Sequence, residues 1–191
     1  MTTLLYKAAG DIRGDDVLPL NQLRVRYPDL YARELAKYGT RLETLDNPVY
    51  PLDCCWADVV FLSPVHPAPI FEAMQESGRI GPVVIDYWTL DADLLDPART
   101  CILLKRHDPE LRPQPAEDFI PYTPEAAAAL STPSERALQR LRNLNATEPL
   151  YPWADIPHIL HRGPIPLSAF RTAAGKVVGQ GGTLRGGIDA P

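Results

Sequence analysis

The chain has 191 residues, of which 45% are hydrophobic and 23% charged, and its formal net charge is -5. This length favours one domain, or one domain with a tail, around one sizeable core. The acidic balance excludes a broad cationic surface for duplex DNA, so contact with DNA or RNA would have to come from local arginine clusters. No apolar run approaches the roughly 18 residues of a membrane span, and no signal peptide is recognisable. The sequence therefore predicts a cytoplasmic protein that does not enter a membrane.

Cysteine and proline usage limit the architecture further. The three cysteines, Cys54, Cys55 and Cys101, are an odd number with two of them adjacent, which is a poor disulfide framework and fits a reducing compartment. The 21 prolines are about twice the usual share of roughly 5%. Because proline fixes φ and removes a backbone donor, we expect short elements joined by rigid connections.

The N-terminal part predicts a strand, two helices and a second strand. Residues 3–8 are apolar and end before Gly10, which predicts the first strand. The apolar spacing from 19 to 38 suits two helices that Pro28 separates, with Gly39 as C-terminal cap. The apolar run 56–62 predicts the next strand.

The middle and C-terminal parts predict shorter elements. We expect helices at 70–78, opening at 67–69, and at 132–143 with Thr132 as N-cap; strands at 83–87, 101–105, 158–162 and 165–170; a helical turn at 90–98; and a loop at 109–124 with a brief extended piece at 119–120. Residues 175–191 are Gly-rich and predict a flexible tail after a domain of residues 1–174. Without regular β-α-β alternation, the order predicts a single α+β domain with a mixed or antiparallel sheet.

Several common sites are disfavoured by the residues themselves. His158 and His161 are three apart on a predicted strand, so they face opposite sides and cannot share one metal ion, and we expect no metal site. No G-x-G-x-x-G or Walker A pattern occurs. A small hydrolase using Ser63, Ser168 or Cys54 is a further alternative, but the chain has no G-x-S-x-G elbow and Ser63 precedes a proline.

One segment runs from a strand into a proline-framed loop. Residues 58–70, D-V-V-F-L-S-P-V-H-P-A-P-I, resemble the stretch D-Y-V-P-F-Y-F-x-P-R-S-P-M that lines the NAD pocket of DarT-type ADP-ribosyltransferases, bacterial enzymes that modify bases in single-stranded DNA. His66 occupies the region of the family's Arg-Ser pair. Residues 158–166, H-I-L-H-R-G-P-I-P, are similar to the family's E-V-L-V-x-x-x-V-P strand, with His158 in place of the catalytic glutamate.

This resemblance implies a split-sheet ADP-ribosyltransferase-like fold and NAD as substrate, with nucleic acid or a nucleotide as acceptor. It assigns catalysis to Arg41 and His158. It places five residues around NAD: Tyr6, Lys7, Phe61, Ser63 and His66. The likeness to a toxin family also leaves room for an antitoxin or another partner protein, and the acceptor could be single-stranded DNA or RNA.

The missing glutamate leaves other readings open. A histidine at this position also occurs in RNA 2′-phosphotransferases, which use NAD to accept a phosphate. A different class is a non-catalytic binding or interaction module, in which Pro64, Pro67 and Pro69 only shape a rigid loop. The enzyme reading requires Arg41, His66 and His158 to converge on one pocket.

Overall fold

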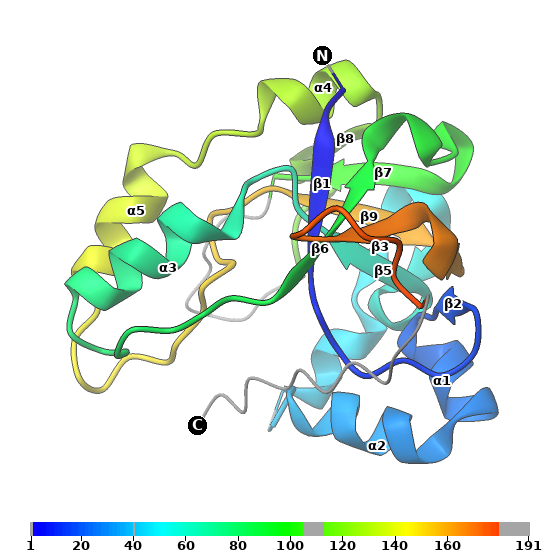
Figure 1. The fold of residues 1–191 in the computed structure, drawn as a ribbon, viewed down its shortest axis with the longest axis horizontal. Helices are drawn as coiled ribbons and strands as arrows, with labels where there is room; N and C mark the ends of the chain where they lie inside the picture. The colour runs from blue at the N-terminus through cyan, green and yellow to red at the C-terminus, as the bar shows by residue number, and fades with distance from the viewer. Residues whose placement is uncertain (1, 40, 105–112, 180–191) are drawn as a thin grey trace.

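Two small antiparallel sheets form the centre of the computed structural model, which describes residues 2–39, 41–104 and 113–179. The first sheet has the order β1-β6-β11 and contains β1 (Leu4–Ala8), β6 (Tyr87–Asp91) and β11 (Phe170–Thr172). The second has the order β5-β9-β7-β8 and contains β5 (Val59–Leu62), β9 (His158–Arg162), β7 (Thr100–Leu103) and β8 (Phe119–Pro121). The predicted α+β class and antiparallel sheet are confirmed (Figure 1).

The two sheets meet edge to edge at one backbone bridge, between Tyr6 of β1 and Ser63 just after β5. Within the described ranges, β1 and β5 share no longer ladder. Residues 7–13 therefore leave the edge of β5, and this separation makes room for a pocket beside residues 59–61.

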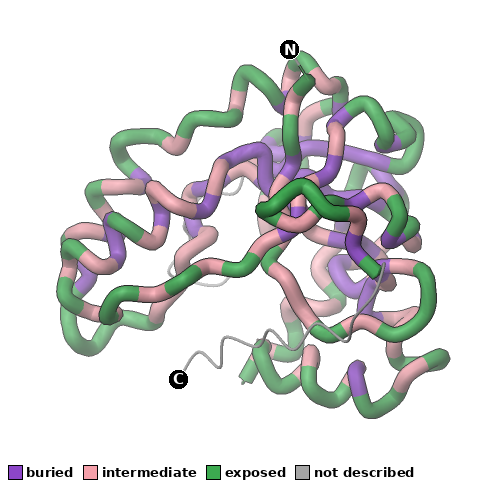
Figure 2. Tube along the Cα trace, in the orientation of Figure 1, coloured by how far each residue is buried: buried purple, intermediate pink, exposed green. Residues whose placement is uncertain are grey.

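The core has two parts. One lies between the two sheets, and the other covers the opposite face of the second sheet. Trp88 and Leu90 of β6 are buried at alternate positions and pack with Leu5 and Phe170 against the second sheet. The opposite face of the second sheet packs against the segment that contains Trp56. Because both of its faces are covered, the strands of the second sheet are almost continuously apolar. Figure 2 shows the buried residues concentrated in these central strands.

Helices flank the sheets as two separate pairs (Figure 1). The first pair is α1 (Leu20–Arg26) and α2 (Pro28–Ala36), divided at Pro28 as predicted. The second is α3 (Pro67–Glu76) and α5 (Glu135–Arg142), which share a small core around Ile70 and Leu141. A short α4 (Pro124–Ala129) precedes α5 and was not predicted. Two minor ribbons pair β2 (Asp16–Val17) with β10 (Ile165–Pro166) and β3 (Pro48–Val49) with β4 (Cys54–Cys55).

Two predicted strands are wrong in position. Residues 81–86 form no regular structure, and the strand begins at Tyr87 and runs into the predicted helical turn. Residues 87–91 form the strand because they pair with β1 and bury Trp88 and Leu90. Val84, in the segment where the strand was predicted, is 92% exposed. The strand expected from residue 56 begins only at Val59, because residues 56–58 form a turn in which Asp58 accepts a hydrogen bond from the backbone of Cys55.

Three further expectations also need correction or limits. The N-cap of α5 is Ser134, whose Oγ accepts a hydrogen bond from the Ala137 backbone, and not Thr132. The strand expected at 165–170 is divided into β10, a 3-10 turn and β11. In the predicted tail, Val178 is buried and donates its N–H to Phe170 O, while residues 180–191 lie outside the described residues. Across the described ranges, every helix is too short or too polar to cross a membrane.

Candidate functional site: a pocket between Lys7 and Phe61

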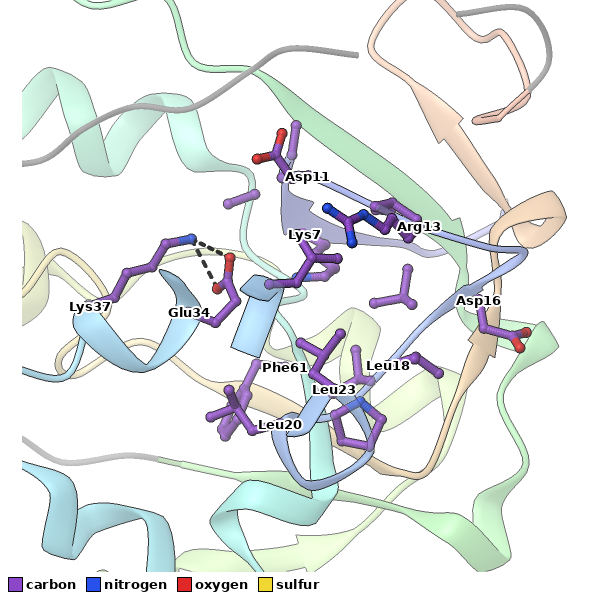
Figure 3. A pocket seen from close by; sticks show the side chains of 18 of the residues that line it. Lys7, Asp11, Arg13, Asp16, Leu18, Leu20, Leu23, Glu34, Lys37 and Phe61 are labelled. Carbon is purple, nitrogen blue, oxygen red and sulfur yellow. Dashed lines mark hydrogen bonds and ion pairs between the residues drawn. The ribbon is translucent and has the colours of Figure 1, made fainter. Parts of the chain in front are cut away.

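A pocket of about 260 Å³ lies between the end of β1, the helices α1 and α2, and the edge of β5. Figure 3 shows Lys7 near its centre, with leucines and Phe61 below and Glu34 and Lys37 to one side. Its apolar lining includes Leu18, Leu20, Leu23, Leu30, Phe61 and Trp88. An apolar cavity with a few polar groups is the usual form of a small-molecule site.

Strand geometry places Lys7 in this pocket. Side chains alternate along β1, so Leu5 and Lys7 share a face; Leu5 is buried in the core, and Lys7 follows where the strand leaves β5. Lys7 is half-buried, and its ammonium group makes no hydrogen bond or ion pair with any residue of the described ranges. Burial lowers the pKa of Lys7 from its ordinary 10.5; Glu34 opposes this shift and Lys37 adds to it.

The other basic groups of the pocket wall have acidic partners. Lys37 Nζ lies 2.8 and 2.9 Å from the two carboxylate oxygens of Glu34. Arg13 forms a two-pronged pair with Asp29. These pairs are largely exposed and contribute little to stability. Among the described pocket residues, Lys7 is left as the cation without a carboxylate partner.

Phe61 connects the pocket to His158. The Phe61 ring meets His158 edge-on, with centroids 6.2 Å apart, and packs against Trp56 at 4.6 Å. His158 is buried, and its Nδ1 lies 2.8 Å from the carbonyl oxygen of Ile156. Because a carbonyl only accepts, Nδ1 carries a proton, and in the neutral ring Nε2 is then the acceptor. His158 lies behind Phe61 and does not line the pocket itself.

Tyr38 connects the pocket to Arg41. Tyr38 lines the pocket, and the backbone N–H of Arg41 donates to Tyr38 O at 3.0 Å. The Arg41 guanidinium stands over the Tyr151 ring, 4.7 Å from its centroid, in a cation-π contact. Arg41 is therefore not one of the lining residues of the pocket, and neither is Tyr151, which its guanidinium contacts.

Tyr6 and His66 form a separate aromatic cluster on the other side of β1. The Tyr6 ring lies 4.9 Å from the His66 ring and 5.7 Å from the Tyr87 ring. His66 is the N-cap of α3: its Nδ1 accepts the Ala68 N–H at 3.1 Å. Since Nδ1 is an acceptor, Nε2 of the neutral ring donates to Tyr87 Oη at 3.1 Å. Burial, followed by the charge of Tyr87, raises the pKa of Tyr6.

Ser63 uses its hydroxyl within the fold. Its Oγ donates to Pro157 O and accepts the N–H of Val65, both at 3.1 Å. These bonds fix the turn between β5 and α3, and no histidine of the described chain is hydrogen-bonded to Ser63. The thiol alternative is also poorly placed, because burial raises the pKa of Cys54 to about 11, with Asp58 adding to the shift.

His161 lies on the face of β9 opposite to His158. Thr100 Oγ1 donates its single proton to Asp96 O at 2.7 Å, so Nδ1–H of His161 donates to Oγ1 at 2.9 Å. The described ranges contain no group of three or more His, Cys, Asp or Glu side chains that could hold a metal ion. His161 is a buried structural histidine.

The structure does not bring the seven expected residues together in one place. Lys7 and Phe61 line the pocket, and His158 lies behind Phe61; Tyr6, Ser63 and His66 gather beyond the bridge between the sheets, and the Arg41 guanidinium contacts Tyr151. Arg41, His66 and His158 therefore do not converge on this pocket. Sequence reasoning missed Glu34, Lys37, Tyr38 and Trp88, which also line the pocket. The helical spacing of residues 28–38 predicted the helix, but no local signal indicated which of its faces would meet Lys7.

Comparison of the chain with protein-family models, with curated proteins and with solved structures gives no match.

Proposed function

We propose that the pocket beneath Lys7 binds the nicotinamide-ribose half of NAD, in a protein that transfers ADP-ribose to a nucleotide or nucleic acid. One observation supports this most directly. The pocket opens where β1 separates from β5, and it is lined by Lys7 from one strand and Phe61 from the other, both expected around NAD from the resemblance.

The size and lining of the pocket fit one half of a dinucleotide. Its volume of about 260 Å³ is just below the roughly 300–1,000 Å³ of pockets that enclose drug-sized ligands. Phe61, which is only partly buried, offers apolar surface to a flat ring. The ammonium of Lys7 has donors available for a carboxamide or ribose oxygen. The other half of NAD would extend past the rim, where Arg13 and Lys37 lie.

The charge requirement of the reaction points to Glu34. Loss of nicotinamide leaves positive charge on the ribose in the transition state, and a nearby carboxylate stabilises it. His158 cannot supply this charge, and it is buried behind Phe61. Glu34 lines the pocket, and its carboxylate is paired with Lys37, whose side chain is largely exposed. In this proposal Glu34 acts in place of the family's glutamate.

Two measurements test the proposal. Calorimetric titration with NAD should show binding that Lys7→Met weakens by about tenfold, the usual effect of losing one charged hydrogen bond. Lys176→Met is the matched control, because Lys176 is exposed and does not line the pocket. Transfer of labelled ADP-ribose to single-stranded DNA, RNA or protein should fall about a hundredfold in Glu34→Gln, with NAD affinity nearly unchanged.

The outcomes separate the enzyme from a binding module. Absence of both heat and thermal shift with millimolar NAD would contradict the proposal, as would equal affinities of the Lys7→Met and wild-type proteins. If NAD binds but neither wild type nor Glu34→Gln transfers label, the protein is a non-catalytic module. The replacement of the expected glutamate by the buried His158 is the observation that favours this second reading.

A further inference from the structure

A second pocket, of about 580 Å³, lies at the far end of β9 and is independent of the NAD proposal. It is lined by residues of five separate segments, which include Gln22 of α1, Leu52 and Asp53, Asp58, Arg99, and the Arg162–Gly163 pair at the end of β9. Two arginines from distant parts of the chain therefore border one cavity.

Backbone carbonyls, and not carboxylates, hold both guanidinium groups. Arg99 Nη2 donates to Arg162 O at 2.7 Å, and Arg162 Nη1 donates to Leu52 O at 2.9 Å. Within the described ranges neither arginine is within ion-pair distance of an acidic side chain. Each guanidinium has five N–H donors, so each keeps its full charge and most of its donors for a ligand.

The backbone is shaped for this arrangement. Gly163 has φ +90°, and a Cβ at this position would collide with the Arg99 guanidinium. Glycine adopts this left-handed conformation without strain. Because it has no Cβ, it also lets the Arg99 guanidinium lie against the backbone. The position of the Arg99 guanidinium at the end of β9 thus depends on the absence of a side chain at Gly163.

Two acidic residues, Asp53 and Asp58, also line this pocket, and neither forms an ion pair with the arginines. Burial opposes ionisation of Asp58, but hydrogen bonds from Asn21 Nδ2 at 2.6 Å and from the Cys55 thiol and backbone at 3.1 Å, with a smaller contribution from the charge of Arg162, outweigh it and lower the pKa of Asp58. Its carboxylate is therefore occupied by donors of the protein itself. Asp53 is exposed at the rim, where salt screens its charge.

A buried acceptor adds a second requirement. Gln22 Oε1 is buried and has no hydrogen-bond partner among the described residues, and Gln22 lines the same pocket. A buried carbonyl oxygen without a donor costs free energy, so a ligand that brings a hydroxyl group gains by bonding to it. The two requirements together are an anionic phosphate for the arginines and a hydroxyl for the amide oxygen.

We propose that the pocket bordered by Arg99, Arg162 and Gln22 binds a sugar phosphate, with the phosphate on the two guanidinium groups and a sugar hydroxyl on Gln22 Oε1. Guanidinium groups match the geometry of phosphate through paired N–H donors, and two of them neutralise its charge.

Calorimetric titration of the full chain with ribose 5-phosphate, inorganic phosphate and ribose tests this assignment. We expect ribose 5-phosphate to bind more tightly than inorganic phosphate, and ribose to bind not at all at millimolar concentration. Arg99→Gln and Arg162→Gln should each weaken both phosphate-bearing probes by about tenfold. Gln22→Leu should remove the advantage of ribose 5-phosphate over inorganic phosphate and leave the affinity for inorganic phosphate unchanged.

Arg171→Gln is the matched control, since Arg171 also donates only to backbone carbonyls, of Ser168 and Phe170, and lies outside the pocket. If Arg162→Gln unfolds through loss of its bond to Leu52 O, Arg99→Gln decides the result. The proposal is overturned if ribose 5-phosphate does not bind, if Arg99→Gln binds it as well as Arg171→Gln does, or if Gln22→Leu leaves the preference for the sugar intact.

Discussion

Tyr6 and Ser63 exchange two backbone hydrogen bonds, from Tyr6 N–H to Ser63 O at 2.7 Å and from Ser63 N–H to Tyr6 O at 2.8 Å. This bridge joins the edges of the two sheets. Because side chains alternate along a strand, Tyr6 and the next residue, Lys7, enter different surroundings on either side of it. Tyr6 meets the His66 ring, whereas Lys7 enters the pocket beside Phe61.

The lowered pKa of Lys7 predicts a specific dependence of stability on pH. The unfolded chain takes up the Lys7 proton below pH 10.5, while the folded protein takes it up only at lower pH, because burial disfavours the ammonium. The free energy of unfolding of the wild type should therefore fall as pH decreases below 10.5, through the lowered pKa. Lys7→Met should be at least as stable at pH 7, with its advantage shrinking as pH rises toward 10.5.

Urea unfolding of both proteins at several pH values measures this difference. Lys176→Met, at an exposed lysine, should differ from wild type by the same small amount at every pH. A difference between Lys7→Met and wild type that stays constant or grows with pH would show that Lys7 is not desolvated in the folded protein.

His161 should make the protein sensitive to mild acid. Burial, with Arg99 adding to it, lowers the pKa of His161 from 6.5 to about 4. The unfolded chain binds this proton below pH 6.5 and the folded protein only near pH 4, so stability should fall across that interval by about 3 kcal/mol. In His161→Gln the free energy of unfolding should change less between pH 6.5 and 4. Carboxylates titrate alike in both proteins, so equal slopes would refute the prediction.

Arg140 should hold the loop that carries Tyr151. Its Nη2 donates to Tyr151 O at 2.9 Å and to Ala154 O at 3.0 Å, and its Nε lies 3.3 Å from Asp155 Oδ2. These groups are mostly buried, so Arg140→Met should lower the free energy of unfolding by about 2 kcal/mol. It should also speed proteolysis within residues 143–157.

Chemical denaturation and limited proteolysis check this prediction. Arg136→Met, on an exposed position of the same helix, is the control and should change stability by less than about 0.5 kcal/mol. Equal effects of the two substitutions would mean that the contacts of Arg140 with the loop do not stabilise it.

The three thiols should react slowly while the protein is folded. Burial raises the pKa of Cys54 to about 11 and that of Cys101 to about 12, and it also raises the pKa of Cys55. Since the thiolate is the reactive form, alkylation by iodoacetamide near neutral pH should be at least about tenfold slower than for a free thiol. Mass spectrometry follows the reaction, and the same protein in urea should react quickly. Rapid alkylation of Cys54 in the folded protein would revive the thiol hydrolase reading.

Gly163→Ala should lower the free energy of unfolding more than an alanine substitution at an unstrained glycine does. Gly163 has φ +90° and lies against Arg99, so we expect a loss of about 1–2 kcal/mol. Gly81→Ala is the control, because Gly81 has no atom near the position of a new Cβ and no positive φ. Thermal unfolding of the two variants compares them, and a tolerated Gly163→Ala would argue against the left-handed conformation of residue 163.

Local patterns in the sequence were sufficient for several elements. Pro28 divides α1 from α2 because it cannot continue a helix and opens the next one well. The apolar run ending at Leu62 forms β5, an edge strand of the second sheet, and its side chains are almost all buried. The α+β class follows from the order of such elements, and the alternation of Tyr6 and Lys7 follows from the period of a strand.

Long-range contacts decided the rest. Residues 87–91 became a strand because β1 and β11, from the two ends of the chain, pair with them. The Ser63 hydroxyl donates its proton to the carbonyl of Pro157, 94 residues away, so that proton is not available for another partner. Glu34 and Lys7 share a pocket only because α2 folds back over the end of β1. Periodicity and capping depend on neighbours along the chain and can be read from it, whereas a pocket depends on which distant surfaces pack together, and that is set by the burial of the whole core.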